Sequence, residues 1–289
     1  MSGLFGGRPQ ARPKICPSCG SLVGSVATKC PQCGASVNFS LAAASRSLGR
    51  LMPTTAPATY AILSVCCVIF AASFLATFSK NGGMPMQGGI EGLLNFGAID
   101  SRVLISLGAS LPQPIDWLQP WRLVTAIFLH ASILHILFNM WVLMDIGPQI
   151  EELYGSARYL FVFVVSGIGG YAVSSFVGKF SVGASGSLLG LIGLLLAVSI
   201  GRRSMGMQML RNQLLRWLIY IVVWGFFFPG IDNWAHLGGF VTGFILGKLM
   251  AERTPASPEE RKRAYAMGWG AALVVVASFV MAGLSALGK

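Results

Sequence analysis

The chain has 289 residues, of which 54% are hydrophobic and only 11% are charged. A soluble globular domain carries about a quarter charged residues, so this composition excludes an ordinary soluble protein. Together with a mean hydropathy of +0.67, it predicts an integral membrane protein whose apolar surface lies in the lipid bilayer.

The formal net charge of +11 at pH 7 is unevenly placed along the chain. Residues 1–55 contain six Lys or Arg residues and no Asp or Glu. A basic segment beside a first apolar span predicts a cytoplasmic N-terminus that contacts anionic lipid headgroups. Nucleic acid is not expected as a partner, because the segment lacks a long Lys/Arg run and interleaved aromatic residues. No cleavable signal peptide is expected, because the first apolar run begins only after residue 56.

Four cysteines near the N-terminus form two matched pairs. Ten residues separate the pair Cys16 and Cys19 from the pair Cys30 and Cys33, and a glycine follows each pair. This pattern resembles a zinc ribbon, in which four thiolates fill a tetrahedral zinc ion and leave no open position for catalysis. Disulfides and a redox-active dithiol are the alternatives. A reducing cytoplasm disfavours disulfides, and two matched cysteine pairs disfavour a redox-active dithiol.

The predicted ribbon, residues 1–35, joins the membrane part through residues 36–55, which are rich in Ser, Ala and Thr and predict a flexible linker. We expect so small a ribbon to depend on zinc for folding. We also expect it to meet a cytoplasmic partner, which the sequence does not identify. Cys66 and Cys67 lie inside the first apolar span, where packing is expected rather than metal binding.

Apolar stretches of spanning length, or slightly less, predict seven membrane helices. They lie at about 57–78, 131–148, 158–177, 185–200, 213–229, 235–251 and 264–287. With the N-terminus inside, the inner turns carry most of the Lys and Arg residues that follow the first span, so the charges agree with this orientation. The long connection from 79 to 130 contains tryptophans among charged residues and is expected to lie partly in the membrane interface.

Polar residues capable of chemistry lie near the start of three of these helices. They are His130, His135 and Asn139 at the second helix, Ser185 at the fourth and His236 at the sixth. All three helices start on the outer side in this topology, and a helix rises about 1.5 Å per residue. The five side chains are therefore expected at a common depth. A polar side chain within the membrane is costly, which favours a functional role.

Small residues follow the serine and the last histidine at helical spacing. Gly186 and Gly190 are four apart after Ser185, and Gly239 and Gly243 repeat that spacing after His236. Such faces let helix backbones approach closely, and packing alone is the simpler explanation of the glycines. The adjacent Ser and His favour catalysis, because a neutral imidazole activates a serine hydroxyl by taking its proton.

His135 and Asn139 are four residues apart and project from one helical face. Both donate hydrogen bonds, so with the backbone N–H of Ser185 they are candidates to stabilise the oxyanion of a tetrahedral intermediate. Hydrogen bonding between helices is the alternative, and it would be the better explanation of an isolated His-x-x-x-Asn pair. A serine and a histidine at the same depth favour the catalytic role.

Together these motifs resemble the rhomboid family of intramembrane serine proteases. They follow the family's order and spacing over roughly residues 57–251: Trp121-Arg122, His130, His135-x-x-x-Asn139, Gly183-Ala184-Ser185-Gly186 and Ala235-His236-x-x-Gly239-x-x-x-Gly243. The resemblance implies that Ser185 is the nucleophile and His236 the general base and acid, with no cofactor for catalysis. It also implies an oxyanion hole that contains His135 and Asn139, with His130 as a supporting neighbour.

The resemblance implies structural roles for Trp121 and Arg122 in the interfacial loop. It extends to Glu151 and Gly155, which match an acidic-glycine pattern after the second helix. The glycines of the serine and histidine motifs are expected to support the site.

One position departs from the family's pattern. Many rhomboids carry an aromatic residue four after the serine, against which the catalytic histidine packs, and this chain has Leu189 there. Asp232, four before His236, is expected to be an interfacial turn residue, since the family needs no third member. Asp145 lies near the inner end of the second helix, where a snorkelling or Arg-paired role is expected.

We therefore expect an all-α membrane protein with a rhomboid-like six-helix core over residues 56–251, preceded by the zinc ribbon. A linker and a seventh transmembrane helix follow over residues 252–289. The expected function is cleavage of transmembrane segments of other membrane proteins, in a bacterial plasma membrane, with the active site opening to the outer side.

Two other classes of protein remain as alternatives. A non-catalytic rhomboid-like protein that binds membrane clients is one, although such proteins usually lack the serine or the histidine that this chain retains. A transporter with a histidine proton relay would predict internal repeats or broken helices in matching halves, which the sequence lacks.

Overall fold

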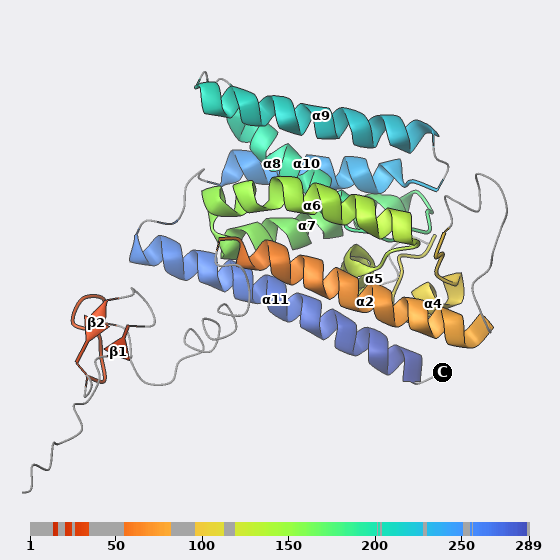
Figure 1. Ribbon diagram of the computed structural model, residues 1–289, viewed down its shortest axis with the longest axis horizontal. Coiled ribbons are helices and arrows are strands. Elements are labelled where there is room, and N and C mark those ends of the chain that lie inside the picture. The colour runs from red at the N-terminus through yellow and green to blue at the C-terminus, as the bar shows by residue number, and fades with distance from the viewer. Residues whose placement is uncertain are drawn as a thin grey trace, which may run out of the picture. The chain divides into compact units, whose positions relative to one another are not determined.

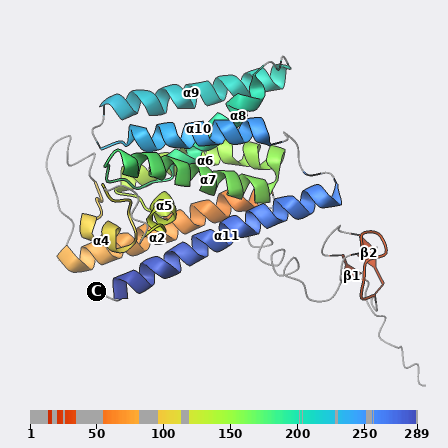
Figure 2. The same ribbon diagram turned by 180° about the vertical axis from the view of Figure 1, so that it is seen from behind.

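The structure of the chain is a computed structural model, drawn in Figures 1 and 2. It describes residues 14–16, 21–24, 27–34, 55–81, 96–112, 119–200, 202, 204–227, 230–250, 255 and 257–287. The chain divides into two compact units, Met1–Pro57 and Ala58–Lys289. This division falls close to residue 56, where the membrane part is predicted to begin.

A short antiparallel hairpin is the regular structure described in the first unit. β1 (Lys14–Ile15) pairs with β2 (Leu22–Val23). Cys16, Val23 and Cys30 form a small buried cluster. So few buried side chains stabilise a fold weakly, which is why a unit of this size usually needs a metal or a disulfide.

Helices form the second unit, as the sequence predicted for an all-α protein. In chain order the unit contains α2 (Pro57–Asn81), α4 (Ser101–Ser106), α5 (Arg122–Thr125), the 3-10 helix η1 (Ala126–Phe128), α6 (Ile133–Tyr154), α7 (Ser156–Phe176), α8 (Ser185–Ser199), α9 (Met205–Phe227), α10 (Asn233–Leu249) and α11 (Pro258–Leu287). The long helices α2 and α6 to α11 correspond to the seven predicted spans. The short helices α4, α5 and η1 lie within the predicted interfacial loop.

The described helices include four, α2, α6, α7 and α11, that are long and apolar enough to cross a membrane by length and composition. α8 is apolar but has only 15 residues. In both views α9 lies at one edge of the helical unit and α11 at the opposite edge (Figures 1 and 2). The chain is therefore a multi-pass membrane protein, as its composition predicted.

Three helices extend beyond their predicted spans. α6 continues through Pro148 to Tyr154, α9 begins at Met205 rather than near 213, and α11 begins at Pro258 rather than near 264. The added turns contain charged or polar residues. Hydropathy detects only the part of a helix that matches the hydrocarbon layer, so it misses turns that continue into the polar zone.

α8 is the central helix of this unit. Its sequence is apolar on every side, and 13 of its 15 residues are buried. A helix of that kind needs neighbours on all faces, and α6, α7, α9 and α10 contact it. Ser185, its first residue, therefore sits at the end of a helix that is fixed from several directions.

Glycines let α8 and α10 approach backbone to backbone, and we call this contact the α8–α10 seam. A Cβ added at Gly239 would collide with the carbonyl oxygen of Gly186, and one added at Gly243 with the carbonyl oxygen of Gly190. No side chain larger than hydrogen fits at either position without moving a helix. The two small-residue faces thus set the separation of these helices.

α9 joins α6 through side chains, and we call this contact the α6–α9 seam. Asp145 of α6 accepts hydrogen bonds from Nε2 of Gln213 at 2.7 Å and from Nε1 of Trp217 at 2.6 Å. Asp145 thus pairs with amide and indole donors of α9 rather than with an arginine. The seam also contains a cluster of aromatic rings, namely Phe138, Trp141, Trp217, Tyr220 and Trp224.

Glu151 fastens the start of α2 to the end of α6. Its buried carboxylate accepts hydrogen bonds from the N–H groups of Ala58 and Thr59, both at 2.8 Å, and from Oγ1 of Thr59 at 2.7 Å. These N–H groups lie in the first turn of α2, where a helix has no internal acceptors and favours a negative charge. Gly155 ends α6 with φ of +79°, so the acidic-glycine pattern marks this junction.

Candidate active site

Ser185 follows a turn that only glycine fits. Gly183 has φ of +126°, a conformation that residues with a Cβ rarely adopt, and an added Cβ would lie 2.6 Å from Nε2 of His135. The N–H of Gly183 donates to the carbonyl oxygen of Ala126 at 2.9 Å. This turn sets the point at which α8, and with it Ser185, begins.

His236 lies in the first turn of α10 and meets the serine. Its Nε2 is 2.8 Å from Oγ of Ser185, a good hydrogen-bond distance, across 51 positions of sequence. The side chain is 8% exposed. Its other ring nitrogen, Nδ1, is buried without a hydrogen-bond partner among the described residues. The structure thus brings together the two residues predicted as nucleophile and base, and no carboxylate in the described part of the chain bonds to the imidazole.

His135 and Asn139, the predicted oxyanion donors, lie on α6. Nδ1 of His135 accepts the N–H of Ala131 at 3.4 Å, which assigns the ring proton to Nε2, the nitrogen nearest Gly183. Nδ2 of Asn139 donates to the carbonyl oxygen of His135 at 2.9 Å, and its Oδ1 is buried without a partner in the described part of the chain. His135 is thus beside the turn that precedes the serine, and Asn139 is one helical turn further along.

His130 packs against His135 rather than against the serine. The two ring centroids are 5.2 Å apart with an interplanar angle of 65°. His130 is fully buried, and neither ring nitrogen has a hydrogen-bond partner among the residues that the structure describes. His130 thus lies beside His135, and its supporting role stays a prediction.

Trp121 and Arg122 lie at the start of α5 and are both buried. Nη1 of Arg122 donates to the carbonyl oxygens of Ile105 and Ala109 at 2.9 and 3.0 Å, and Nε donates to Oε1 of Gln119 at 2.6 Å. A guanidinium presents several fixed donors. Arg122 therefore links the end of α4 to α5. These contacts stabilise the loop before α6 and do not involve Ser185.

Asp232, which was expected to be only an interfacial turn residue, caps a helix. It is the N-cap of α10, and its Oδ1 accepts the N–H groups of Trp234 at 3.0 Å and Ala235 at 3.2 Å. A capping carboxylate satisfies N–H groups that have no partner inside the helix. Leu189, which replaces the family's aromatic residue, is 1% exposed and lies within the apolar core.

Two residues of α7 contact the site although the sequence analysis did not identify them. The hydroxyl of Tyr171 donates to the carbonyl oxygen of Gly183 at 2.6 Å, and Oγ of Ser174 donates to Oδ2 of Asp232. Tyr171 and Ser174 are three positions apart and so share one helical face. Two hydroxyl groups three positions apart near the end of a predicted membrane helix are the signal that could have pointed to them.

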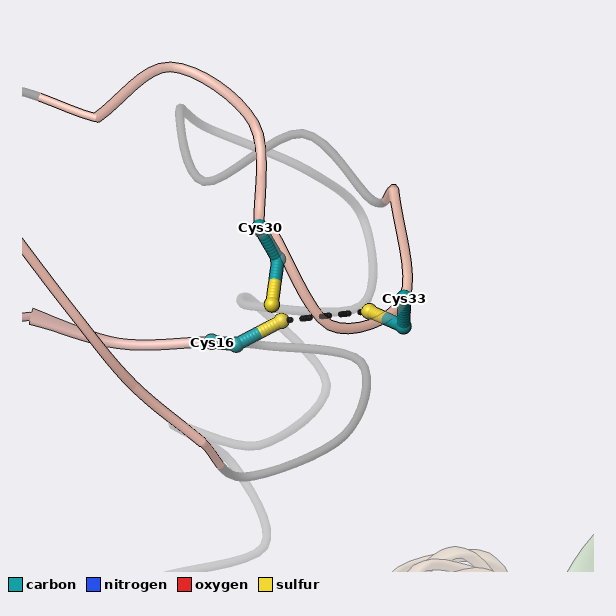
Figure 3. Close-up of side chains that lie close together, drawn as sticks. All are labelled: Cys16, Cys30 and Cys33. Carbon is teal, nitrogen blue, oxygen red and sulfur yellow. Dashed lines mark hydrogen bonds between the residues drawn. The ribbon is translucent and has the colours of Figure 1, made fainter.

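Three of the four predicted metal ligands lie together in the first unit, and their sulfur atoms point toward one another (Figure 3). The Sγ atoms of Cys16, Cys30 and Cys33 all lie within 4.8 Å of one another, with Cys16 and Cys33 3.6 Å apart. Cys19 lies outside the described residues. Tetrahedral zinc with Zn–S bonds of about 2.3 Å places its sulfurs about 3.8 Å apart. The three thiols are therefore spaced to hold a metal ion.

Comparison with known proteins finds a family match within the helical unit. The family model described as "Rhomboid domain" matches residues 118–253. Rhomboid protease GluP of Bacillus subtilis (strain 168) is 34% identical over 153 residues, which cover 53% of this chain and 30% of that protein. RHOMBOID-like protein 5 of Arabidopsis thaliana is 36% identical over 57% of both chains.

A third relative, Rhomboid-like protease 3 of Toxoplasma gondii, is 34% identical over 51% of this chain and 58% of its own length. The alignments thus span between about a third and somewhat over half of each relative. The matched region contains both Ser185 and His236 and all of α6 to α10. On the family match, residues 118–253 form a rhomboid domain, and the chain is similar to these rhomboid proteins over about half of its length.

Proposed function

We propose that this protein is an intramembrane serine endopeptidase that hydrolyses peptide bonds in or beside transmembrane segments of other membrane proteins. The observation that carries the proposal is the 2.8 Å separation of Ser185 Oγ and His236 Nε2. A serine hydroxyl becomes a nucleophile when a positioned base takes its proton. The names of two relatives, Rhomboid protease GluP and Rhomboid-like protease 3, support the same activity.

In the proposed reaction, Ser185 Oγ attacks the scissile carbonyl carbon while Nε2 of His236 takes the hydroxyl proton. The tetrahedral intermediate collapses when the C–N bond breaks, and His236 returns the proton to the leaving amine. The remaining acyl ester is hydrolysed by a water molecule, from which His236 takes a proton as the base. The products are a new carboxyl terminus, a new amino terminus and the regenerated serine.

Negative charge develops on the carbonyl oxygen during both steps, and three donors are available near Ser185. They are the backbone N–H of Ser185, Nε2–H of His135 and the side-chain amide of Asn139. The tautomer of His135 supports this role, because its Nδ1 accepts the Ala131 N–H and leaves the proton on the side of Gly183. Each fixed donor of this kind is worth about 10²–10³ in kcat when it faces the oxyanion.

The substrate class follows from the position of the site in a membrane protein. A transmembrane helix hides its peptide bonds inside its own hydrogen-bond ladder, so a substrate has to unwind locally to present one. Small or helix-breaking residues near a membrane boundary favour such unwinding. With the basic N-terminus on the cytoplasmic side, the proposed site opens to the opposite face of the membrane.

For the first unit we propose a structural zinc ion held by Cys16, Cys19, Cys30 and Cys33. Four thiolates complete its coordination, so the ion stabilises the fold and takes no part in peptide hydrolysis. Metal analysis of a Cys16→Ser/Cys19→Ser variant tests this assignment. Loss of bound zinc is expected, and an unchanged zinc content would exclude a four-cysteine site.

Cleavage of single-span substrates in liposomes tests the protease assignment. The wild type is expected to cut at least one substrate, and Ser185→Ala and His236→Ala are expected to be inactive. Ser187→Ala is the matched control, because Ser187 is a buried serine two positions after Ser185 on α8, and its hydroxyl has no partner among the described residues. Activity in either dyad variant would reject the mechanism. A wild type that binds several substrates and cuts none would favour the client-binding alternative.

A further inference from the structure

α7 contacts the segments that carry both reacting groups. Tyr171 is 2% exposed, and its hydroxyl lies 2.6 Å from the carbonyl oxygen of Gly183 and 3.2 Å from that of Ala126. Gly183 is two residues before Ser185, and its own N–H is bonded to the same Ala126 carbonyl. Tyr171 therefore holds the turn that immediately precedes Ser185.

Ser174, one turn further along α7, reaches the other reacting segment. It is fully buried, and its hydroxyl donates to Oδ2 of Asp232. The other carboxylate oxygen of Asp232, Oδ1, caps α10 by accepting the N–H groups of Trp234 and Ala235. The backbone carbonyl oxygen of Asp232 accepts the N–H of His236 at 3.2 Å. Ser174 and Asp232 thus hold the turn of α10 from which His236 projects.

Close backbone contact between α7 and α10 supports the same connection. A Cβ added at Gly170 would lie 2.6 Å from the carbonyl oxygen of Ala235, the residue before His236. One added at Gly186 would lie 3.2 Å from that same oxygen and 4.0 Å from Cα of Gly170. The outer end of α7 therefore touches both the start of α8 and the start of α10.

Among the described residues, the imidazole of His236 has no hydrogen-bond partner other than Ser185. In a catalytic triad a carboxylate bonds to Nδ1 of the histidine and holds the ring in position. Nδ1 of His236 is buried and has no partner among the described residues. The position of the ring relative to Ser185 consequently depends on where the backbone of α10 begins.

We infer that α7 aligns the two members of the dyad, with Tyr171 positioning Ser185 through Gly183 and Ser174 positioning His236 through Asp232. Asp232, Ser174 and Tyr171 are positioning residues and do not touch the substrate. The inference rests on the proposed function. Because a displacement of about 1 Å between reacting groups costs up to about a hundredfold in rate, small losses of alignment are measurable.

The kinetic test uses Asp232→Ala, Asp232→Asn and Ser174→Ala in the full chain, with a substrate that the wild type cleaves. Asp232→Ala removes the cap and the bond to Ser174, so kcat is expected to fall about ten- to a hundredfold with KM unchanged. Asp232→Asn keeps a capping oxygen and is expected to restore kcat to within about threefold of the wild type. Adding Ser174→Ala to Asp232→Ala is expected to cause little further loss, since both act through one contact.

Asn233→Ala is the matched control for general loosening of α10. Its side chain donates to the carbonyl oxygen of Gly225 at 2.8 Å and so ties the same turn to α9 instead of α7. We expect this variant to retain kcat. Tyr171→Phe, which removes only one hydroxyl, tests the serine side of the inference, and a fall in kcat with a normal thermal transition is expected.

Three outcomes would overturn the inference: wild-type kcat in Asp232→Ala, equal losses in Asp232→Ala and Asn233→Ala, or losses found only in variants that unfold. Each of these requires that the wild type is active and Ser185→Ala is not. An inactive wild type would instead remove the proposed function, and the inference with it. The two failures are therefore distinguishable in one set of assays.

Discussion

The α8–α10 seam and the α6–α9 seam join neighbouring helices in opposite ways. At the first, glycines bring backbone against backbone, so that an added Cβ at Gly239 or Gly243 collides with a carbonyl oxygen of α8. At the second, bulky aromatic rings and one carboxylate span the gap between helices. Burial differs accordingly. In α8, 13 of 15 residues are buried, whereas α9 buries four of its 23.

This difference shows where the molecule needs an exact separation. The backbone of a helix cannot move aside as a side chain can, so a glycine contact between backbones fixes the distance between two helices. Long side chains adjust their torsions and tolerate small displacements of a helix. Ser185 and His236 lie in the first turns of the two helices of the rigid seam, and a 2.8 Å contact between their side chains requires that rigidity.

Gly243→Val is expected to have the largest effect, because it breaks the rigid seam. The added side chain would meet the carbonyl oxygen of Gly190, which has no way to rotate aside. We expect a loss of about 3 kcal/mol in the free energy of unfolding, at the upper end for overpacking. Unfolding in mixed micelles measures this loss.

Gly283→Val on α11 is the control, since nothing lies within 4 Å of a Cβ added there. Both substitutions put the same β-branched residue into a membrane helix. Equal stability of the two variants would contradict the account of the α8–α10 seam.

Asp145→Ala is expected to have an intermediate effect, because it breaks the adjustable seam only. The indole N–H of Trp217, which is 7% exposed, loses its acceptor. A buried donor left unpaired costs about 1–3 kcal/mol. Hydrogen exchange is expected to rise in α9 and to stay unchanged in α8 and α10.

Glu152→Ala is the matched control, since it removes an exposed acidic residue from the same helix. Faster exchange spread evenly over α8, α9 and α10 in Asp145→Ala would show that the two seams are not independent. Faster exchange of α9 in the control would show that any loss of charge on α6 has this effect.

Trp141→Leu is expected to have the smallest effect of the three. Trp141 is 63% exposed, and its ring meets that of Trp217 edge to face at 5.1 Å. Such aromatic pairs contribute about 0.5–1.5 kcal/mol. A double-mutant cycle with Trp217→Leu measures the pair. A coupling larger than the loss in Gly243→Val would reverse the ranking of the two seams.

Much of the helical unit was predictable because hydropathy and small-residue spacing report directly on membrane helices. The seven long helices, the serine at the start of α8 and the glycine faces of α8 and α10 all follow from local pattern. Helix ends such as Met205 and Pro258 were missed, because polar turns outside the hydrocarbon layer carry no hydropathy signal.

The contact between Ser185 and His236 was predictable, and the contacts that hold their segments in place were not. Charge and helix direction place Ser185 and His236 at one depth, but the contacts of Tyr171 and Ser174 depend on how α7 is rotated against its neighbours. Sequence spacing within one helix does not determine that rotation. The partner of Asp145 was missed for the same reason, since Gln213 and Trp217 lie 68 and 72 positions away.

Reaction with a fluorophosphonate, which modifies activated serine hydroxyls, tests most directly whether the α8–α10 seam creates a nucleophile. Peptide mass analysis of the labelled full-length protein is expected to find the adduct on Ser185 in the wild type. The adduct should be absent in Ser185→Ala and strongly reduced in His236→Ala. An unlabelled Ser185 in the folded wild type, or equal labelling when His236 is replaced, would contradict the account.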